Sequence, residues 1–494
     1  MTDTLLGVDI GTTGTKAVVF DTQGRALASA YRAYPLHTGA AGEAWLDPNQ
    51  VLEASRQAIA EAVSVAPPPV ALAVACQGEA FTPVDVAGKP SGEAIVTFDR
   101  RGQVGAEILR SRGWADREES AGLPFSWIVT AAKLAYLQAT DLERYRQARA
   151  FLCFEDLLLH SLTGTATISS SLAQRTFLLD RHTQNWHPDS VGEMELTGRL
   201  ATVVPSGQAV GRVSASGARS FGLPDGCIVV AGAHDQTAAL IGSGAIDPGV
   251  GAHSTGTVDC ISLSVADRPV GQLARSGYGL GLHPVMGRAV TLAFGFGGGA
   301  LLSWWRSVLT SPEHSPTIDA LVREAEDALA TQTEPCAIPF WSGSGTPDLD
   351  ARDQGALLGM TLDTSRGQIT AALIRGMVLE TARNLAVLRE NNITVRELRL
   401  VGGGSRNPVW NTLRANLLGV SYVEVDTPEA GALGAAILAG SGVGLWASLP
   451  EACAQMVHLG RRHEPHHDAA ARSAALQRYQ NAVAAIRTTN DKGV

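Results

Sequence analysis

The chain has 494 residues, of which 45% are hydrophobic and 18% are charged, a composition typical of globular rather than disordered or fibrous proteins. At roughly 150 residues per domain, this length predicts two to three domains with substantial cores. The net charge of −9, without long runs of like charge, argues against a nucleic-acid partner, because binding to a polyanion relies on clustered Lys and Arg. The six cysteines are scattered singly and are expected to be reduced, mostly buried thiols.

The first residues, MTDTLLGVDI, carry Asp3 where a secretory signal would have basic residues. No apolar run in the sequence approaches the roughly 18 residues that a membrane-spanning helix needs. We therefore expect a cytoplasmic protein with no membrane partner. The oligomeric state is left open, with a homodimer as one alternative.

The N-terminal part predicts an antiparallel meander, because three apolar runs are separated by a Gly/Thr turn and by Gly24. A helix should follow, with Asp47 as its cap and Pro48 at its first position, and it should end near Val65. The expected strands cover residues 5–10, 16–21 and 26–34, with a later buried strand at 70–75.

The second half repeats this order. A strand at 249–254 leads into a second Gly/Thr turn at 254–257 and another strand at 258–265. Two halves that each open with a strand and a Gly/Thr turn predict a duplicated domain, divided near Gly244 into 1–244 and 245–494. Further elements are expected as a strand at 398–402 and as helices at 408–418, 430–439 and 468–486.

The first turn, Gly11 to Thr15, has the groups of a phosphate clamp. Glycines let backbone N–H groups face phosphate oxygens, Lys16 supplies charge, and Asp9 can hold a hydrated magnesium ion. The alternative is an ordinary Gly-rich hairpin. The second Gly/Thr turn favours the clamp, because two such turns in corresponding places could hold a polyphosphate from both sides.

Five stretches of this sequence, in order along nearly the whole chain, resemble the FGGY carbohydrate kinases. That resemblance implies an α/β fold with two actin-like (ribonuclease-H-like) ATPase domains flanking a cleft. It also implies ATP-dependent phosphorylation of a sugar or polyol hydroxyl. The stretches are DIGTTGTKAVVFD (9–21), GAHDQTAALIGSG (232–244), STGT (254–257), VGGGSRNPVWNTLRANLLG (401–419) and EAGALGAAILAG (429–440).

By this resemblance Asp235 is the catalytic base, which orients the acceptor hydroxyl and takes its proton. Asp235 could instead cap the helix that starts near Gln236. Both roles are compatible, and a carboxylate at a helix N-terminus is expected to stay ionised.

The resemblance also implies a site for ATP and Mg²⁺, with Asp9 as the metal ligand. Gly295, Gly297 and Ala300 fit the pattern GxGxxA of dinucleotide-binding proteins, but a dehydrogenase would leave both Gly/Thr turns without a role. The expected nucleotide contacts are Asp9, Gly11, Thr12, Thr13, Gly14 and Lys16 in the first domain, and Thr257, Gly299, Gly403, Gly404 and Asn407 in the second.

Polar residues that follow two predicted strands of the first domain, at 70–75 and 94–98, should bind the acceptor, because open α/β sheets place ligands at the carboxyl ends of their strands. Phe81 or Trp127 could supply an apolar face. The expected acceptor contacts are Gln77, Glu79, Phe81, Asp99, His234 and Gln236.

The segment CQGEAF (76–81) resembles the L-fuculose-kinase-like branch of the family, which implies a ketose such as L-fuculose or D-xylulose. A glycerol- or erythritol-type polyol kinase is the alternative, disfavoured because Gly78 stands where glycerol kinases place an Arg. An actin-like ATPase and a non-catalytic sugar-binding regulator are further alternatives. The intact Asp9, Lys16 and Asp235 argue against the regulator.

A histidine-rich stretch from His458 to His467 could be interpreted as a metal site. Its irregular spacing and Pro465 favour a solvated loop instead.

Overall fold

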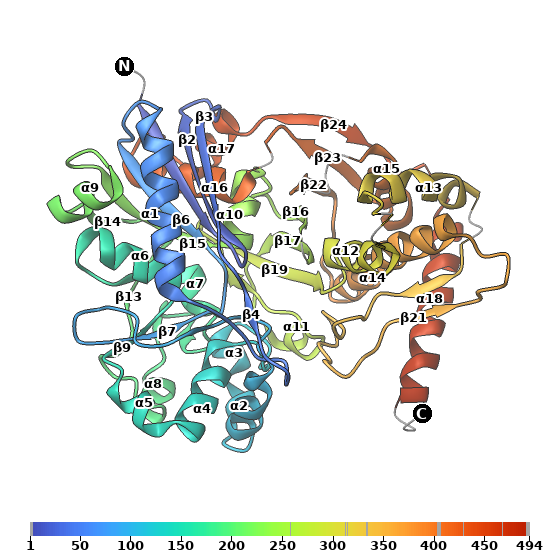
Figure 1. The fold of residues 1–494 in the computed structure, drawn as a ribbon, viewed down its shortest axis with the longest axis horizontal. Coiled ribbons are helices and arrows are strands. Elements are labelled where there is room, and N and C mark those ends of the chain that lie inside the picture. Colours follow the sequence, from blue (N-terminus) through green and yellow to red (C-terminus); the bar gives the residue numbers. More distant parts are fainter. Residues whose placement is uncertain are drawn as a thin grey trace.

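The computed structural model describes residues 3–256, 258–311, 313, 315–331, 334–402, 407–427, 429–466 and 468–490. Two central sheets lie side by side, one in the blue and green half of the chain and one in the yellow to red half (Figure 1). The strands of the first sheet are, in sheet order, β14 (Ala209–Arg212), β15 (Ile228–His234), β6 (Ala71–Cys76), β1 (Thr4–Ile10), β2 (Gly14–Asp21) and β3 (Ala26–Ala33).

The second sheet repeats the pairing of the first. In both, a strand forms an antiparallel meander with the next strands of the chain on one side and a parallel pair on the other. This shared topology confirms the predicted meander and the predicted repeat. The strands are β18 (Gly281–Leu282), β19 (Arg288–Gly295), β17 (Asp259–Ala266), β16 (Val250–Thr255), β22 (Glu397–Val401), β23 (Ser421–Val425) and β24 (Leu459–His463).

Helices pack around both sheets. The predicted first helix is present, and the Asp47 carboxylate caps it by accepting from the N–H of Asn49. The helices of the first half are α1 (Pro48–Ser64), α2 (Arg101–Arg110), α3 (Glu118–Ala121), α4 (Thr130–Thr140), α5 (Leu142–Gln147), α6 (Phe154–Thr163), α7 (Ser170–Gln174), α8 (Pro188–Glu193), α9 (Ala215–Phe221) and α10 (Asp235–Gly242). Those of the second half are α11 (Gly271–Arg275), α12 (Gly299–Leu309), α13 (Ile318–Thr331), α14 (Arg366–Glu390), α15 (Pro408–Leu418), α16 (Ala430–Gly442), α17 (Leu449–Met456) and α18 (Ala469–Asn490).

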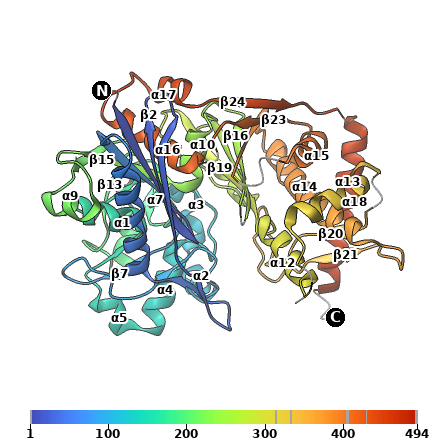
Figure 2. The same cartoon turned by 45° about the horizontal axis from the view of Figure 1, so that its top comes forward.

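Helices α16 and α17 return to the first sheet, although they come late in the sequence. Both lie beside the blue strands in the two views (Figure 1, Figure 2). Leu433 and Ala436 of α16 share a buried cluster with Leu5 and Val18 of the first sheet. The two halves are thus tied together by a late segment of the chain, and a division at Gly244 stays a prediction.

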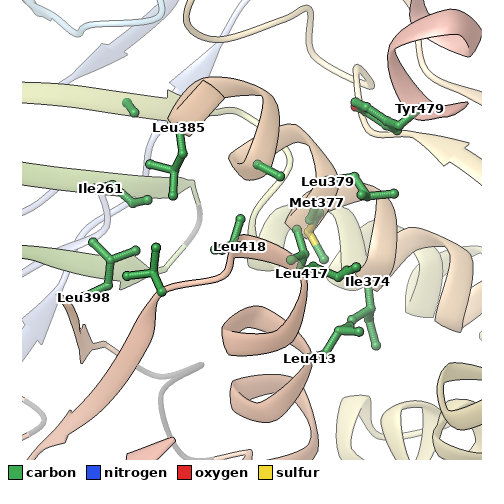
Figure 3. Close-up of a cluster of buried hydrophobic side chains, with 14 of the residues drawn as sticks. Ile261, Ile374, Met377, Leu379, Leu385, Leu398, Leu413, Leu417, Leu418 and Tyr479 are labelled. Atoms are coloured by element: carbon green, nitrogen blue, oxygen red, sulfur yellow. The ribbon is translucent and has the colours of Figure 1, made fainter. Parts of the chain in front are cut away.

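The interior of the second half is a large apolar cluster between its sheet and helices α14, α15 and α18. Figure 3 shows Met377 of α14 and Leu417 of α15 beside each other, with Leu398 of β22 on the sheet side. This packing anchors α15 against α14 and beside the second sheet.

Two short predictions differ from the structure. The strand expected at 94–98 is only β8 (Ala94–Ile95). The histidine-rich stretch is not all loop, because β24 pairs with β23 and its buried His463 lies 2.8 Å from a Glu424 carboxylate oxygen; His467 lies outside the described residues. Among the helices described, none has the length and apolar character needed to cross a membrane.

Candidate active site

Three chain segments meet at one edge of the first sheet. Strands β1, β6 and β15 are parallel, and Cys76 at the end of β6 pairs with Ile10 on one side and His234 on the other. Because the carboxyl ends of parallel strands share an edge, the residues that follow them, near 11, 77 and 235, lie together. The topology therefore brings the predicted base, the first Gly/Thr turn and the predicted acceptor residues to one place.

Asp235 is the first residue of α10, and its carboxylate accepts from the N–H of Gln236 at 2.6 Å. Nε2 of the buried His234 lies 3.1 Å from Oδ1 of Asp235, and burial lowers the pKa of His234 well below its usual range, so the imidazole is neutral. Burial, together with the carboxylates of Asp9 and Glu79, raises the pKa of Asp235 to about 8. The expectation that the helix N-terminus keeps the pKa of this carboxyl low is therefore wrong, because desolvation by burial is the larger effect.

Two side chains stabilise the first Gly/Thr turn through hydrogen bonds to its backbone. The Tyr34 hydroxyl donates to the carbonyl of Gly11 at 2.7 Å, and the Gln77 amide donates to the same oxygen at 3.1 Å. Thr12 Oγ1 lies 3.5 Å from Gln77 Oε1. Gln77, predicted to bind the acceptor, thus also supports the turn, while Thr13 is exposed at its tip.

Asp9 faces the start of α16. A Cβ on Gly431 would lie 2.4 Å from Oδ2 of Asp9, so only glycine allows the helix to approach the carboxylate this closely. Lys16 Nζ pairs with Glu429 at 2.5 Å. Burial and the Glu429 carboxylate raise the pKa of Asp9 to about 6, with Lys16 opposing them.

Gly431→Ala should therefore lower kcat by about tenfold or more, because the added methyl group must displace the Asp9 carboxylate or the helix start. The thermal midpoint should change little if the carboxylate moves. Gly192→Ala is the control, because a Cβ on Gly192 would meet open space, and it should leave kcat unchanged. Gly444→Ala is less suitable as a control, because the backbone of Gly444 has a positive φ. Wild-type kcat in Gly431→Ala would contradict a functional role for Asp9.

Glu79 forms a buried ion pair that local sequence does not reveal. Its carboxylate, 3% exposed, accepts from Nε of Arg175 at 2.5 Å and from the Thr97 hydroxyl at 3.1 Å. Arg175 follows α7, far from Glu79 in sequence, and no motif indicated it. A Cβ on Gly78 would lie 2.8 Å from His234 Nε2 and 3.5 Å from Arg175 Cγ, so these two side chains occupy the space beside that glycine.

Glu79 adopts a left-handed conformation with φ of 59°, which is uncommon for a residue other than glycine. Its carbonyl accepts from the Thr130 hydroxyl and from Nζ of Lys133, both at 3.0 Å. Lys133 is fully buried, and burial lowers its pKa to about 8. The two donors from α4 hold the Glu79 backbone in place and so orient its carboxylate.

Two expected acceptor residues are placed in the interior instead. Phe81 is 2% exposed and packs edge to face on Phe151. Asp99 is fully buried, and its carboxylate accepts from the Arg101 guanidinium and from the N–H of Ala44. Both side chains therefore stabilise the interior of the first domain, and their predicted contacts with the acceptor stay predictions.

A cavity opens between the halves beside His234 and Arg175. Its polar side includes Ser171 and Thr237 from the first half. The cavity's opposite wall is apolar and belongs to the second sheet, being formed by Leu282, Val290, Leu292 and Phe294. The apolar face expected from Phe81 or Trp127 stays a prediction.

On the second half, the other Gly/Thr turn packs against the start of α12. The N–H of Gly299 donates to the carbonyl of Gly256 at 2.8 Å, and a Cβ on Gly298 would lie 2.5 Å from the carbonyl carbon of Val258. A helix N-terminus beside a glycine turn suits phosphate.

Gln236, a predicted acceptor contact, lies against the second sheet, because its Oε1 accepts from the Ser262 hydroxyl of β17. Thr257, Gly403 and Gly404, also expected at the nucleotide, lie outside the described residues.

Asn407 begins α15, and its side-chain oxygen accepts from the N–H of Trp410 at 2.9 Å. This bond gives it a capping role, and its predicted contact with adenosine stays a prediction.

Comparison with known proteins places this arrangement in a family. The N-terminal domain model of the FGGY family of carbohydrate kinases matches residues 4–242, and the C-terminal domain model of the same family matches residues 251–443. This chain belongs to the FGGY family of carbohydrate kinases. It is therefore a phosphotransferase with an alcohol group as acceptor.

Among curated relatives, a glycerol kinase of Bordetella parapertussis is 32% identical over 97% of this chain and 96% of its own length. A glycerol kinase of Janthinobacterium is 29% identical over 98% of both chains.

Solved structures agree on the fold. A gluconate kinase from Lactobacillus acidophilus aligns over 99% of this chain and 98% of its own, with a TM-score of 0.88 at 22% identity. A Plasmodium falciparum glycerol kinase with ADP aligns over 98% of both chains, with a TM-score of 0.83 at 19% identity. The expected α/β fold with two actin-like, ribonuclease-H-like domains is confirmed.

Proposed function

We propose that this chain is an ATP-dependent kinase of a short polyol, of the glycerol type, and that the transfer takes place beside Asp235. The ketose expected from the 76–81 segment is supported less well than this alternative, because the full-length relatives named above are glycerol kinases. One observation in the structure carries the revision. The argument against glycerol was that glycine, not arginine, stands at position 78. The Arg175 side chain, however, passes beside Gly78 with its Cγ, and its guanidinium pairs with Glu79.

This pair suits an acceptor with adjacent hydroxyl groups. A carboxylate can only accept hydrogen bonds and a guanidinium can only donate them, so Glu79 and Arg175 together can bind two neighbouring hydroxyls. Arg175 lines the cavity directly, with His234 beside it. A short polyol would thus be held with one terminal hydroxyl toward Asp235.

ATP would lie between the two Gly/Thr turns. In the first, Thr12 and Gly14 flank the tip and Lys16 supplies positive charge. In the second, the turn at Gly256 lies against the start of α12 at Gly299, where the positive end of the helix dipole would favour phosphate. Asn407, with the predicted residues near it, would lie on the adenosine side.

Asp9 fits a magnesium ligand. Its carboxylate lies among other acidic groups, and repulsion from Glu429 contributes to its raised pKa, so a divalent cation would be stabilised there. Mg²⁺ is commonly held by one or two carboxylates together with substrate phosphates. When bound, it would neutralise part of the negative charge of the phosphates.

The chemistry asked of the protein is modest. The acceptor hydroxyl oxygen bonds to the γ-phosphorus, the bond from that phosphorus to the β–γ bridging oxygen breaks, and ADP leaves. Asp235 takes the hydroxyl proton, while the N–H of Gln236 and Nε2 of His234 orient its carboxylate. Lys16 holds phosphate charge.

A coupled assay of ADP release, with ATP and Mg²⁺ and one acceptor at a time, tests the proposal. We expect the highest kcat/KM with glycerol or erythritol and a value at least about tenfold lower with D-xylulose and L-fuculose. A higher kcat/KM with either ketose would overturn the polyol assignment and leave the kinase assignment intact.

A further inference from the structure

A buried arginine lies behind the second Gly/Thr turn. Arg414 projects from α15 and is 1% exposed. Its guanidinium stacks over the Trp410 ring at 4.4 Å and donates to Asn411 Oδ1 at 3.4 Å. Burying a guanidinium is costly unless its N–H groups find partners, so the position of this side chain needs an explanation.

The decisive contact is with the turn itself. Nη2 of Arg414 donates to Oγ1 of Thr255 at 3.0 Å. Thr255 is the last residue of β16 and directly precedes Gly256, whose carbonyl accepts from the N–H of Gly299. The guanidinium therefore holds the point at which the chain enters the turn.

The point at which the chain leaves the turn is held as well. Asp259 pairs with Thr255 across the hairpin. One carboxylate oxygen lies 2.9 Å from Nε2 of His253, and the other accepts from the Thr381 hydroxyl at 3.0 Å. His253 in turn lies 2.8 Å from the hydroxyl of Tyr422 through its Nδ1. Polar and charged groups, most of them buried, thus fix both ends of the turn.

Arg414 also connects two parts of the nucleotide side. Helix α15 starts directly after Asn407 and is anchored in the apolar cluster by Leu413 and Leu417 (Figure 3). A side chain on this helix that bonds to Thr255 links the helix to the turn.

We propose that Arg414 is a positioning residue for nucleotide binding, which sets the second Gly/Thr turn relative to α15 through its bond to Thr255. The inference rests on the proposed role of that turn in holding ATP phosphates. Arg414 need not touch the nucleotide, because its effect passes through the backbone of residues 255 and 256. A merely structural arginine would affect stability and leave nucleotide affinity unchanged.

The test is calorimetric titration of ADP with Mg²⁺ into the full-length protein, with KM for ATP and for glycerol measured in parallel. Arg414→Met keeps the length of the side chain and removes the donors. We expect a dissociation constant for ADP about tenfold higher or more, the size of a lost hydrogen bond to a charged group. KM for ATP should rise with it, and KM for glycerol should stay within about twofold.

Two further variants keep the test decisive. Thr255→Val removes the acceptor of the same bond, and the double variant should be no weaker for ADP than Arg414→Met alone, because both remove one interaction. Arg414→Lys should recover part of the affinity. Arg389→Met is the matched control, because Arg389 donates to the carbonyl of Leu418 at the other end of α15 and should leave ADP affinity unchanged.

The outcomes separate the two proposals. A wild-type protein that binds no ADP would overturn the nucleotide site and this inference with it. ADP binding by wild type that Arg414→Met and Thr255→Val both retain within twofold would overturn this inference alone. If Arg414→Met does not fold, Thr255→Val and Arg414→Lys decide, since additive losses in their double variant would also contradict coupling through this bond.

Discussion

Asp235→Asn should lower kcat by about 10² to 10⁴ while ADP affinity stays within about twofold, because a base contributes to proton transfer and not to nucleotide binding. The amide keeps the shape of the side chain and can still accept from the N–H of Gln236. Steady-state kinetics with glycerol and titration with ADP measure the two quantities. Asn49→Ala, at the exposed start of α1, is the control for effects of producing and purifying a variant, and it should leave both quantities unchanged.

The stability of the same variant should move in the opposite direction. The folded protein holds the Asp235 proton up to a pKa of about 8, whereas the unfolded chain releases it near the ordinary value of 3.8. The wild-type protein therefore loses stability as pH rises between these values. Asp235→Asn removes this cost, so its thermal midpoint at pH 8 should equal or exceed that of wild type.

A gain in stability with a loss of activity is the pattern of a group retained for chemistry. A variant with more than a tenth of wild-type kcat would contradict the assignment of Asp235 as base. The same pKa predicts that wild-type kcat/KM rises with pH and levels off above about 8, since this ratio reports the free enzyme.

Arg175→Met should lower kcat/KM for glycerol by about 10² or more and leave ADP affinity unchanged. The substitution removes the donor that pairs with Glu79 and leaves a carboxylate of 3% exposure without its cation. Truncating one partner of such a pair costs about 2–5 kcal/mol. Kinetics with varied glycerol at saturating ATP measure the effect.

Two comparisons separate binding from folding in this prediction. Arg175→Met combined with Glu79→Gln should recover thermal stability without recovering glycerol kcat/KM, because the buried charge is gone but the donor is still missing. Arg101→Met is the matched control: Arg101 pairs with the buried Asp99, so it should lower stability and leave kcat/KM per folded molecule unchanged. Equal losses of kcat/KM in both arginine variants would contradict an acceptor role for Arg175.

Local pattern in the sequence predicted much of the fold. The repeated order of strand, Gly/Thr turn and strand predicted the duplicated topology, because apolar runs and glycine turns are signals that a short stretch of sequence contains. Helix α15 begins and ends at the predicted residues, since Asn407, Pro408 and Gly419 are strong start and stop signals.

What the sequence did not predict depends on contacts between distant segments. Arg175 reaches Glu79 from across the first domain, and Glu429 reaches Lys16 from the far end of the chain. Neither contact has a local signal. The ionisation of Asp235 was misjudged for the same reason, since the helix start is visible in the sequence but the burial and the neighbouring carboxylates are not.

The central claim, phosphoryl transfer from ATP to a terminal polyol hydroxyl, is tested most directly by competition. The protein is given limiting ATP, Mg²⁺ and equal concentrations of glycerol, erythritol, D-xylulose and L-fuculose, and the phosphorylated products are identified by mass spectrometry. The proposed function predicts that a polyol phosphate accounts for most of the ATP consumed and that Asp235→Asn forms almost none in the same time. A ketose phosphate as the main product, or ATP hydrolysis without any phosphorylated acceptor, would contradict it.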